Sequence, residues 1–237
     1  MRPLVLVHGF MGGSDQWDLQ APLAEERELI AVDLPGFGRN AHMSPINTIR
    51  GFAEWVLAEV APREFDLIGH SMGGMIVQEM MRLAPDRVCK LVLYGTGATG
   101  ELPGRFETIE TSMRRARTEG ARHTARRIAA TWFLEREAAP VYAACVAIAE
   151  RAELTAIIAG LEAMRCWSGL DHLAHIAAPV LVLWGDGDRT YAWTQVETLW
   201  RTIPGASLAV VPACAHAVHL ERPNHFNALL ADFLDES

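Results

Sequence analysis

The chain has 237 residues; half of them are hydrophobic, 21% are charged, and the formal net charge is -8. This composition is typical of one globular domain with a large core, and it excludes an intrinsically disordered chain. An acidic balance offers no surface for phosphates, so we expect no nucleic-acid partner.

Six short apolar segments recur along the chain, and each ends near a glycine, a proline or an aspartate. In chain order they are PLVLVHG, ELIAVDLPG, FDLIGHS, RVCKLVLYG, APVLVLWGDGD and ASLAVVP. Continuous apolar runs of this length, without polar alternation, favour strands that are covered on both faces. The sequence therefore predicts a mainly parallel sheet of about six strands.

Helical patterns separate these strands. Apolar residues at spacings of three and four predict helices over 45–61, 72–83, 194–203 and 224–234. Helices that alternate with parallel strands must lie on both faces of the sheet, so we expect a doubly wound α/β architecture.

The alternation stops after Tyr94, because almost 80 residues pass before the next strand. Helical patterns occupy this segment, over 106–117, 121–133, 140–151 and 153–167. An insertion of this size over the strand ends is where a lid over a binding site would lie. We therefore expect a core of residues 1–96 and 176–237 and a helical cap subdomain of residues 97–175.

The predicted cap is rich in arginine. It carries 10 arginines against 10 acidic residues, whereas the rest of the chain has 11 basic and 19 acidic residues. We interpret most of these arginines as partners of glutamates on solvated helix faces. Arg114, Arg115, Arg126 and Arg127 lie within one region, and a second hypothesis is that one of them binds a substrate carboxylate.

The cysteines and the N-terminal segment indicate the compartment. The four cysteines are far apart, with no CxxC pair and no spacing typical of metal ligands, so we expect reduced thiols. The first apolar run is too short for a signal peptide, and no stretch of 18 apolar residues occurs. We expect a cytoplasmic protein without a membrane span.

The segment FDLIGHSMGGMIVQEM holds the strongest motif, Gly69-His70-Ser71-Met72-Gly73. A G-x-S-x-G pattern indicates a nucleophilic serine when it lies between a buried strand and a helix, as here. Such a turn strains the serine backbone, and the N-terminus of the helix favours negative charge beside it. We predict that Ser71 is the nucleophile; the alternative is an idle serine in a glycine-rich turn.

Five motifs together resemble the α/β-hydrolase superfamily, in its esterase, enol-lactonase and carbon-carbon hydrolase branch. They are His8-Gly9-Phe10, DLPGFG at 33–38, the Ser71 motif, GDGD at 185–188, and His216 in AHAVHLERP. The likeness covers nearly the whole chain and implies the α/β-hydrolase fold.

The resemblance also implies the partners of Ser71. The fold requires a histidine beyond the last strand, and of His216 and His219 the first matches the family position, although Ala215 precedes it where relatives commonly have glycine. The imidazole needs a carboxylate on its far nitrogen. Asp188 matches the family pattern G-x-x-D and leaves Asp186 as a turn residue.

Acyl transfer places negative charge on the carbonyl oxygen, and preorganised donors stabilise it. The resemblance assigns this oxyanion hole to the backbone N–H groups of Phe10 and Met72, and it assigns His8 to holding the loop by hydrogen bonding. Aromatic side chains are candidates for the substrate pocket or for ordinary packing. These candidates are Trp132, Phe133, Trp167 and Trp193.

The sequence thus predicts a carboxylesterase-like serine hydrolase that cleaves a small ester or lactone through an acyl-enzyme. Two alternatives stay open: a carbon-carbon bond hydrolase or lyase with the same triad, acting on a dienoate or diketone, and a non-catalytic small-molecule receptor. Comparing turnover of a p-nitrophenyl ester with turnover of a dienoate distinguishes the esterase from the carbon-carbon bond enzyme. Labelling of Ser71 by a fluorophosphonate distinguishes an enzyme from a receptor. No HExxH pattern or paired ligand cluster occurs, so we expect no metal and no cofactor.

Relatives of this kind carry an antiparallel hairpin before the first central strand, and this sequence begins almost at that strand. We expect either a natural start further upstream, or a sheet edge that is exposed or covered by a partner. Both a monomer and a homodimer are compatible with this pattern.

Overall fold

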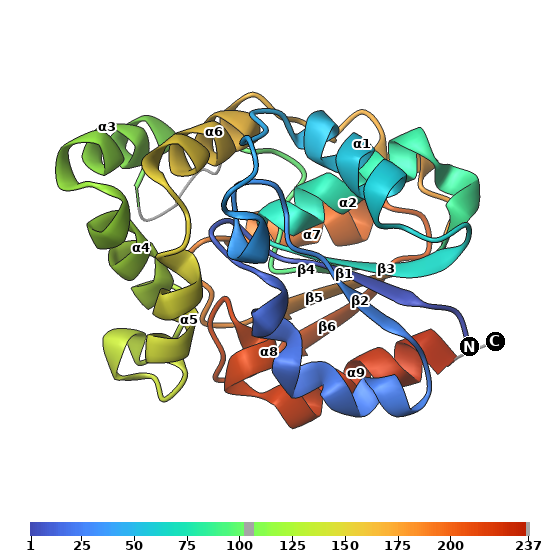
Figure 1. Ribbon diagram of the computed structural model, residues 1–237. Helices are drawn as coiled ribbons and strands as arrows, with labels where there is room; N and C mark the ends of the chain where they lie inside the picture. Colours follow the sequence, from blue (N-terminus) through green and yellow to red (C-terminus); the bar gives the residue numbers. More distant parts are fainter. Residues whose placement is uncertain (102–106, 236–237) are drawn as a thin grey trace.

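The computed structural model describes residues 1–101 and 107–235, and its centre is one parallel sheet (Figure 1). The strands are β1 (Leu4–Val7), β2 (Leu29–Ala31), β3 (Phe65–His70), β4 (Val88–Tyr94), β5 (Val180–Gly185) and β6 (Ser207–Val211). They follow the order β2-β1-β3-β4-β5-β6, and every neighbouring pair is parallel. The six predicted strands and the parallel sheet are confirmed.

Side chains alternate across the sheet and bury two hydrophobic clusters. Val5 and Val7 of β1 belong to one cluster, whereas Leu4 and Leu6 belong to the other. Such alternation is what a strand covered on both faces requires.

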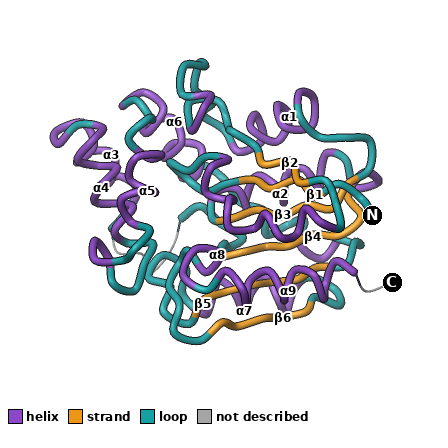
Figure 2. Tube along the Cα trace, turned by 60° about the horizontal axis from the view of Figure 1, so that its bottom comes forward, coloured by secondary structure: helices purple, strands orange, loops and turns teal. Residues whose placement is uncertain are grey.

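Helices cover both faces, as Figures 1 and 2 show. The first cluster is covered by α1 (Ile49–Glu59), α2 (Met72–Leu83) and α7 (Trp193–Thr202). The second is covered by the 3-10 segment η1 (Ser14–Glu25) and by α8 (Val218–Glu221) and α9 (Pro223–Asp235). The doubly wound architecture is therefore confirmed.

Some element bounds differ from the prediction. The helix expected over 45–61 begins only at Ile49, because Thr48 caps it: the Thr48 side chain accepts a hydrogen bond from the N–H of Gly51 at 3.0 Å. The segment η1 was not predicted. It contains Pro22, which has no N–H to donate, and its apolar residues follow no regular helical period.

Among the described residues between β4 and β5, four α-helices lie beyond the carboxyl ends of the strands (Figure 1). They are α3 (Ile109–Glu119), α4 (Ala121–Ala130), α5 (Tyr142–Ala149) and α6 (Leu154–Arg165). Phe106, at the start of the first predicted helix, lies outside the described residues. Buried residues of these helices, such as Ile128 and Leu161, share the cluster of Val5 and Phe10, so this segment and the sheet share one core.

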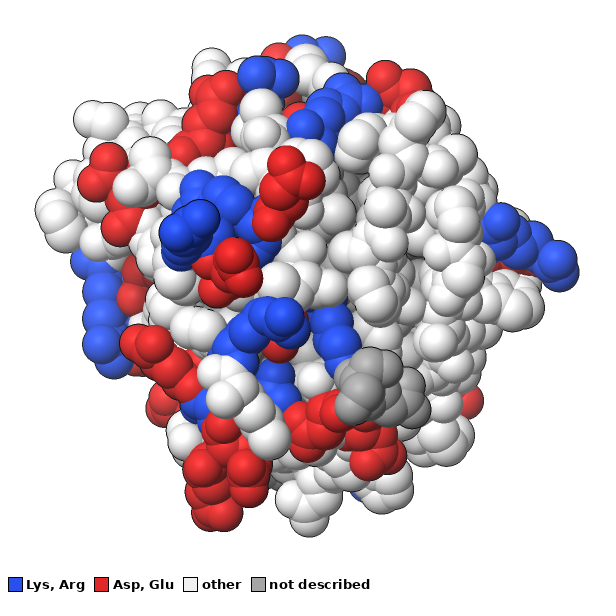
Figure 3. Space-filling view, turned by 90° about the vertical axis from the view of Figure 1, so that its right-hand side faces the viewer, with Lys and Arg blue, Asp and Glu red and all other residues white. Residues whose placement is uncertain are grey.

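At the opposite end of the sheet, basic and acidic side chains are interspersed on the surface (Figure 3). The Arg27 side chain at this end is only 3% exposed; it lies 3.1 Å from Asp66 of β3 and also pairs with Asp235 of α9. Through these two ion pairs, the buried Arg27 side chain connects the C-terminal helix α9 to strand β3.

Two further observations concern cysteines and membranes. All four cysteines are free, as expected. Within the part of the chain that the structure describes, every helix is too short or too polar to cross a membrane.

Candidate active site

Ser71 forms the turn between β3 and α2 at the carboxyl edge of the sheet. Its backbone has φ 57° and ψ -119°, a conformation that side-chain-bearing residues rarely adopt. Three hydrogen bonds hold it there: its N–H donates to the carbonyl of Tyr94 at 3.0 Å, and its carbonyl accepts from Gly74 N–H at 2.9 Å and from Thr96 Oγ1 at 2.8 Å. The strained turn is thus fixed by β4 and the residues that follow it.

Gly73 allows the first turn of α2 to pack against β1. A Cβ atom at this position would meet the carbonyl oxygens of Val7 and His8, the second at 2.6 Å. Backbone oxygens cannot yield by so much, so only glycine fits while the turn keeps its shape.

His216 and Asp188 form a hydrogen-bonded pair. His216 Nδ1 lies 2.8 Å from Asp188 Oδ2, and the two side chains are 2% and 0% exposed. The other carboxylate oxygen accepts hydrogen bonds from the N–H groups of Thr190 at 2.7 Å and Tyr191 at 3.3 Å. A carboxylate fixed in this way favours the tautomer with hydrogen on Nδ1 and leaves Nε2 as an acceptor.

Tyr94 and His70 hold the loop of His216 from behind. The Tyr94 hydroxyl lies 2.9 Å from the His216 carbonyl oxygen and His70 Nε2 lies 3.0 Å from it, and both groups donate because a carbonyl only accepts. The two rings stack with centroids 4.4 Å apart. Burial lowers the pKa of His70 well below its ordinary value and raises that of Tyr94, so both are neutral near pH 7.

The loop after β1 is held by His8. His8 Nδ1 lies 2.7 Å from the carbonyl of Gly9, and Nε2 accepts from the N–H of Leu34 at 3.1 Å. Burial lowers the pKa of His8 to about 4, so the ring is neutral and donates through Nδ1 only. This geometry agrees with the structural role expected for His8.

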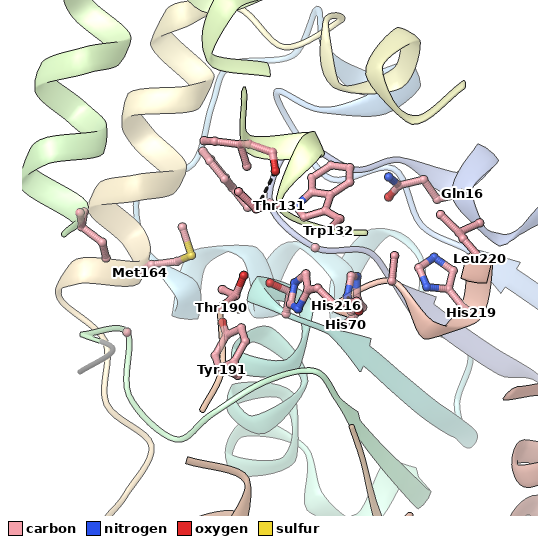
Figure 4. Close-up of a pocket in the computed structure, with 17 residues that line it drawn as sticks. Gln16, His70, Thr131, Trp132, Met164, Thr190, Tyr191, His216, His219 and Leu220 are labelled. Carbon is pink, nitrogen blue, oxygen red and sulfur yellow. Dashed lines mark hydrogen bonds between the residues drawn. The ribbon is translucent and has the colours of Figure 1, made fainter. Parts of the chain in front are cut away.

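Ser71 and His216 line one cavity between the sheet and the four inserted helices (Figure 4). The structure thus places Ser71 and His216 on the wall of one cavity, with His216 hydrogen-bonded to Asp188. Phe10 also lines the cavity, and Met72, the first residue of α2, follows Ser71 directly in the chain.

Of the four aromatic residues predicted for the pocket, only Trp132 lines the cavity. Phe133 is fully buried in the core, and Trp167 is hydrogen-bonded to Glu79 through Nε1 at 3.0 Å. Trp193 is 38% exposed on α7, where it contacts other tryptophans. An aromatic residue type predicts that a side chain is buried, but it does not predict whether that side chain faces the cavity. That depends on the orientation of the helix or loop that carries it.

Three of the four arginines named as candidates for binding a substrate carboxylate pair with glutamates. Arg115 and Arg127 pair with Glu107 and Glu119, and Arg126 pairs with Glu150. None of these, nor Arg114, is among the described residues that line the cavity. The interpretation as ion pairs with neighbouring glutamates holds for these three.

Several lining residues were not expected from the sequence. They are Gln16, His70, Ile109, Ile128, Thr131, Met164, Thr190, Tyr191, His219 and Leu220. His70, His219 and Leu220 carried a signal, because they stand within the motifs of Ser71 and His216.

Comparison with known proteins identifies the family and the fold of this chain. The model of the alpha/beta hydrolase family matches residues 4–228. The chain is 27% identical over 243 residues to the pimeloyl-[acyl-carrier protein] methyl ester esterase of Yersinia enterocolitica, covering 99% of this chain and 93% of that protein.

Solved structures show the same fold. The enol-lactonase from Burkholderia xenovorans LB400 has a TM-score of 0.89 at 24% identity, covering 99% of this chain and 92% of that one. A thermophilic esterase from Thermogutta terrifontis has a TM-score of 0.87 at 26% identity, with coverage of 99% and 89%.

Proposed function

Since the chain belongs to the alpha/beta hydrolase family, we propose that it is a serine hydrolase that cleaves small carboxylic esters or lactones through Ser71, His216 and Asp188. The observation that carries this proposal is the 2.8 Å hydrogen bond between His216 and Asp188, with the His216 ring in the same cavity as the strained Ser71. The Yersinia relative is a methyl ester esterase and the Thermogutta neighbour is an esterase, which supports ester chemistry.

In the proposed mechanism, Ser71 Oγ attacks the ester carbonyl while His216 Nε2 takes the hydroxyl proton. Asp188 stabilises the imidazolium that forms, because it already accepts from Nδ1. The N–H groups of Phe10 and Met72 are proposed to stabilise the oxyanion. His216 then returns the proton to the departing alcohol, and a water molecule activated by the same ring hydrolyses the acyl-enzyme.

The cavity wall indicates the kind of substrate. Among its described residues there is no Asp, Glu, Lys or Arg, and the wall combines apolar side chains with uncharged polar ones. A wall of this kind favours a small neutral ester. We also propose that residues 97–175 act as the cap over this site and that the protein works in the cytoplasm.

A panel of p-nitrophenyl esters of two to eight carbons and γ-butyrolactone tests the proposal, with the Ser71→Ala protein as control. We expect turnover of at least one substrate class, and a loss of about 1000-fold or more in kcat/KM in the variant. Equal hydrolysis by the two proteins would show that Ser71 is not the nucleophile. A dienoate cleaved while every ester is left intact would favour carbon-carbon bond chemistry.

A further inference from the structure

His219 presents a buried nitrogen that the proposed mechanism does not use. The side chain is 1% exposed and lines the same cavity as Ser71. Its Nδ1 lies 3.0 Å from the hydroxyl oxygen of Tyr94. Its Nε2 has no hydrogen-bond partner among residues 1–101 and 107–235. A buried polar atom without a partner calls for an explanation, and here the atom belongs to a residue of the cavity wall.

The surroundings of Tyr94 decide which nitrogen of His219 carries the hydrogen. The Tyr94 oxygen lies 2.9 Å from the His216 carbonyl, 3.0 Å from His219 Nδ1 and 3.2 Å from His219 N–H. A hydroxyl has one hydrogen, and a carbonyl only accepts, so that hydrogen points to the carbonyl of His216. His219 Nδ1 must therefore donate to the Tyr94 oxygen.

The other nitrogen is consequently an acceptor. Burial, together with the charge of His216, lowers the pKa of His219 to about 3, so its ring is neutral near pH 7 and has a single N–H. With that hydrogen on Nδ1, Nε2 carries only a lone pair. Such a group attracts a hydroxyl or amide N–H and repels a carboxylate oxygen.

The neighbours of His219 define a subsite. Figure 4 shows Gln16, His219 and Leu220 at one end of the cavity and Met164 at the other. Gln16 is 6% exposed and has both a donor and an acceptor in its side-chain amide. This end thus combines an uncharged polar pair with the apolar side chain of Leu220.

We propose that His219 Nε2 accepts a hydrogen bond from a hydroxyl or amide N–H of the substrate, so that the enzyme selects esters carrying such a donor. The inference rests on the proposed ester hydrolysis and specifies its substrate class. An ester without a donor would leave the buried Nε2 of His219 unpaired in the complex, which costs binding free energy. The enzyme should therefore prefer an ester with a donor to the same ester without one.

Matched pairs of esters test this selection. Methyl hexanoate is compared with its 2-, 3- and 6-hydroxy derivatives, and propyl hexanoate with 2-hydroxyethyl hexanoate, which places the hydroxyl on the alcohol side. We expect at least one hydroxylated ester to be preferred by about 10- to 100-fold in kcat/KM.

The variant His219→Asn separates recognition from packing. An asparagine amide N–H can replace Nδ1 as donor to Tyr94, but it places nothing at the position of Nε2. We expect the ratio between hydroxylated and plain ester to fall towards one, whereas His225→Asn, at an exposed position of α9, keeps the ratio of the unmodified protein. If His219→Asn does not fold, calorimetric binding of the same ester pairs to the Ser71→Ala protein measures the preference without it.

The outcomes distinguish the two proposals. Hydrolysis of both members of every pair with equal kcat/KM would overturn the inference and leave the esterase standing, and so would a preference that survives in His219→Asn. Absence of any ester hydrolysis would overturn the proposed function. A binding preference of the Ser71→Ala protein for the hydroxylated ligands would still support the role of His219.

Discussion

The hydroxyl of Tyr94 donates a hydrogen bond to the backbone carbonyl of His216 over 2.9 Å, and His70 donates to the same oxygen. Tyr94 ends β4, and His70 directly precedes Ser71. The two residues therefore connect the loop of the proposed base to the strand ends that carry the proposed nucleophile. A displacement of a catalytic group by about 1 Å can lower the rate of an enzyme strongly. We therefore expect the contact between Tyr94 and the His216 loop to affect kcat.

Replacing Tyr94 by phenylalanine removes this donor and leaves the His216 carbonyl with one partner. We expect kcat for a plain ester to fall about 10-fold, because the ring of His216 loses a contact that positions it; His219 in the cavity wall also loses its hydrogen-bond partner. The free energy of unfolding should fall by about 1–3 kcal/mol. Steady-state kinetics and urea unfolding measure both quantities.

Tyr142→Phe is the matched control, since the Tyr142 hydroxyl also donates to a backbone carbonyl, that of Arg126, on the exposed side of the inserted helices. If Tyr94→Phe and Tyr142→Phe have the same kcat, Tyr94 does not position His216.

Gly73→Ala should disrupt the turn of Ser71. The added methyl group would meet the carbonyl oxygens of Val7 and His8, which are backbone atoms rather than the ends of flexible side chains. We expect either loss of soluble folded protein or a fall of more than about 3 kcal/mol in the free energy of unfolding. At Gly97 the nearest atom to an added methyl is 3.4 Å away, so Gly97→Ala should fold normally. Equal thermal unfolding of the two variants would contradict this account of the turn.

The ion pair of Arg27 and Asp66 predicts a purely structural effect. Burial raises the pKa of Asp66, and the charge of Arg27 opposes this shift. Arg27→Ala leaves the carboxylate buried without its partner, so the free energy of unfolding should fall by about 3–5 kcal/mol. Because the pair lies at the end of the sheet opposite the cavity, kcat of the folded variant should be unchanged.

Arg50→Ala provides the comparison for that variant, because Arg50 pairs with Glu54 on an exposed helix face and should contribute far less. Urea unfolding measures the free energy of unfolding of both variants. An equal, small decrease in both would mean that the buried ion pair of Arg27 contributes no more stability than an exposed one.

The buried histidines predict how stability depends on pH. Burial lowers the pKa of His8 to about 4 and that of His219 to about 3, from 6.5 for an exposed histidine. Below pH 6.5 the unfolded chain therefore binds more protons than the folded protein, and the free energy of unfolding falls as the pH falls. Between pH 7 and 5 each of the two histidines should contribute a loss of about 2 kcal/mol.

Urea unfolding at pH 7 and pH 5 measures this difference. His123→Gln, a substitution at an exposed position of α4, is the control for the loss of a histidine as such. A protein equally stable at both pH values would contradict neutral burial of His8 and His219.

Sequence reasoning located the fold and the proposed catalytic residues better than the cavity wall. The helix expected over 72–83 has those bounds, because a strand, a strained serine and a helix are specified by neighbouring residues. Trp132 and Phe133 show where such reasoning ends. They are adjacent in sequence, yet only Trp132 lines the cavity, since the packing of distant helices decides which side chain faces it.

The position of His219 illustrates the same limit. The sequence offered His219 only as the alternative to His216, and the structure shows that its side chain bonds to Tyr94. That Nε2 of His219 is an acceptor depends on the hydroxyl of Tyr94, which is 125 residues away in sequence. Such a property follows from tertiary contacts alone.

Covalent labelling tests the central claim, that Ser71 is a nucleophile activated by His216 and Asp188. The protein is treated with a fluorophosphonate, digested, and the modified peptide is identified by mass spectrometry. We predict one label per chain, on Ser71, with no label in Ser71→Ala and labelling slowed by at least about 100-fold in Asp188→Asn. A protein that stays unlabelled, or that carries the label on another residue, would contradict the account.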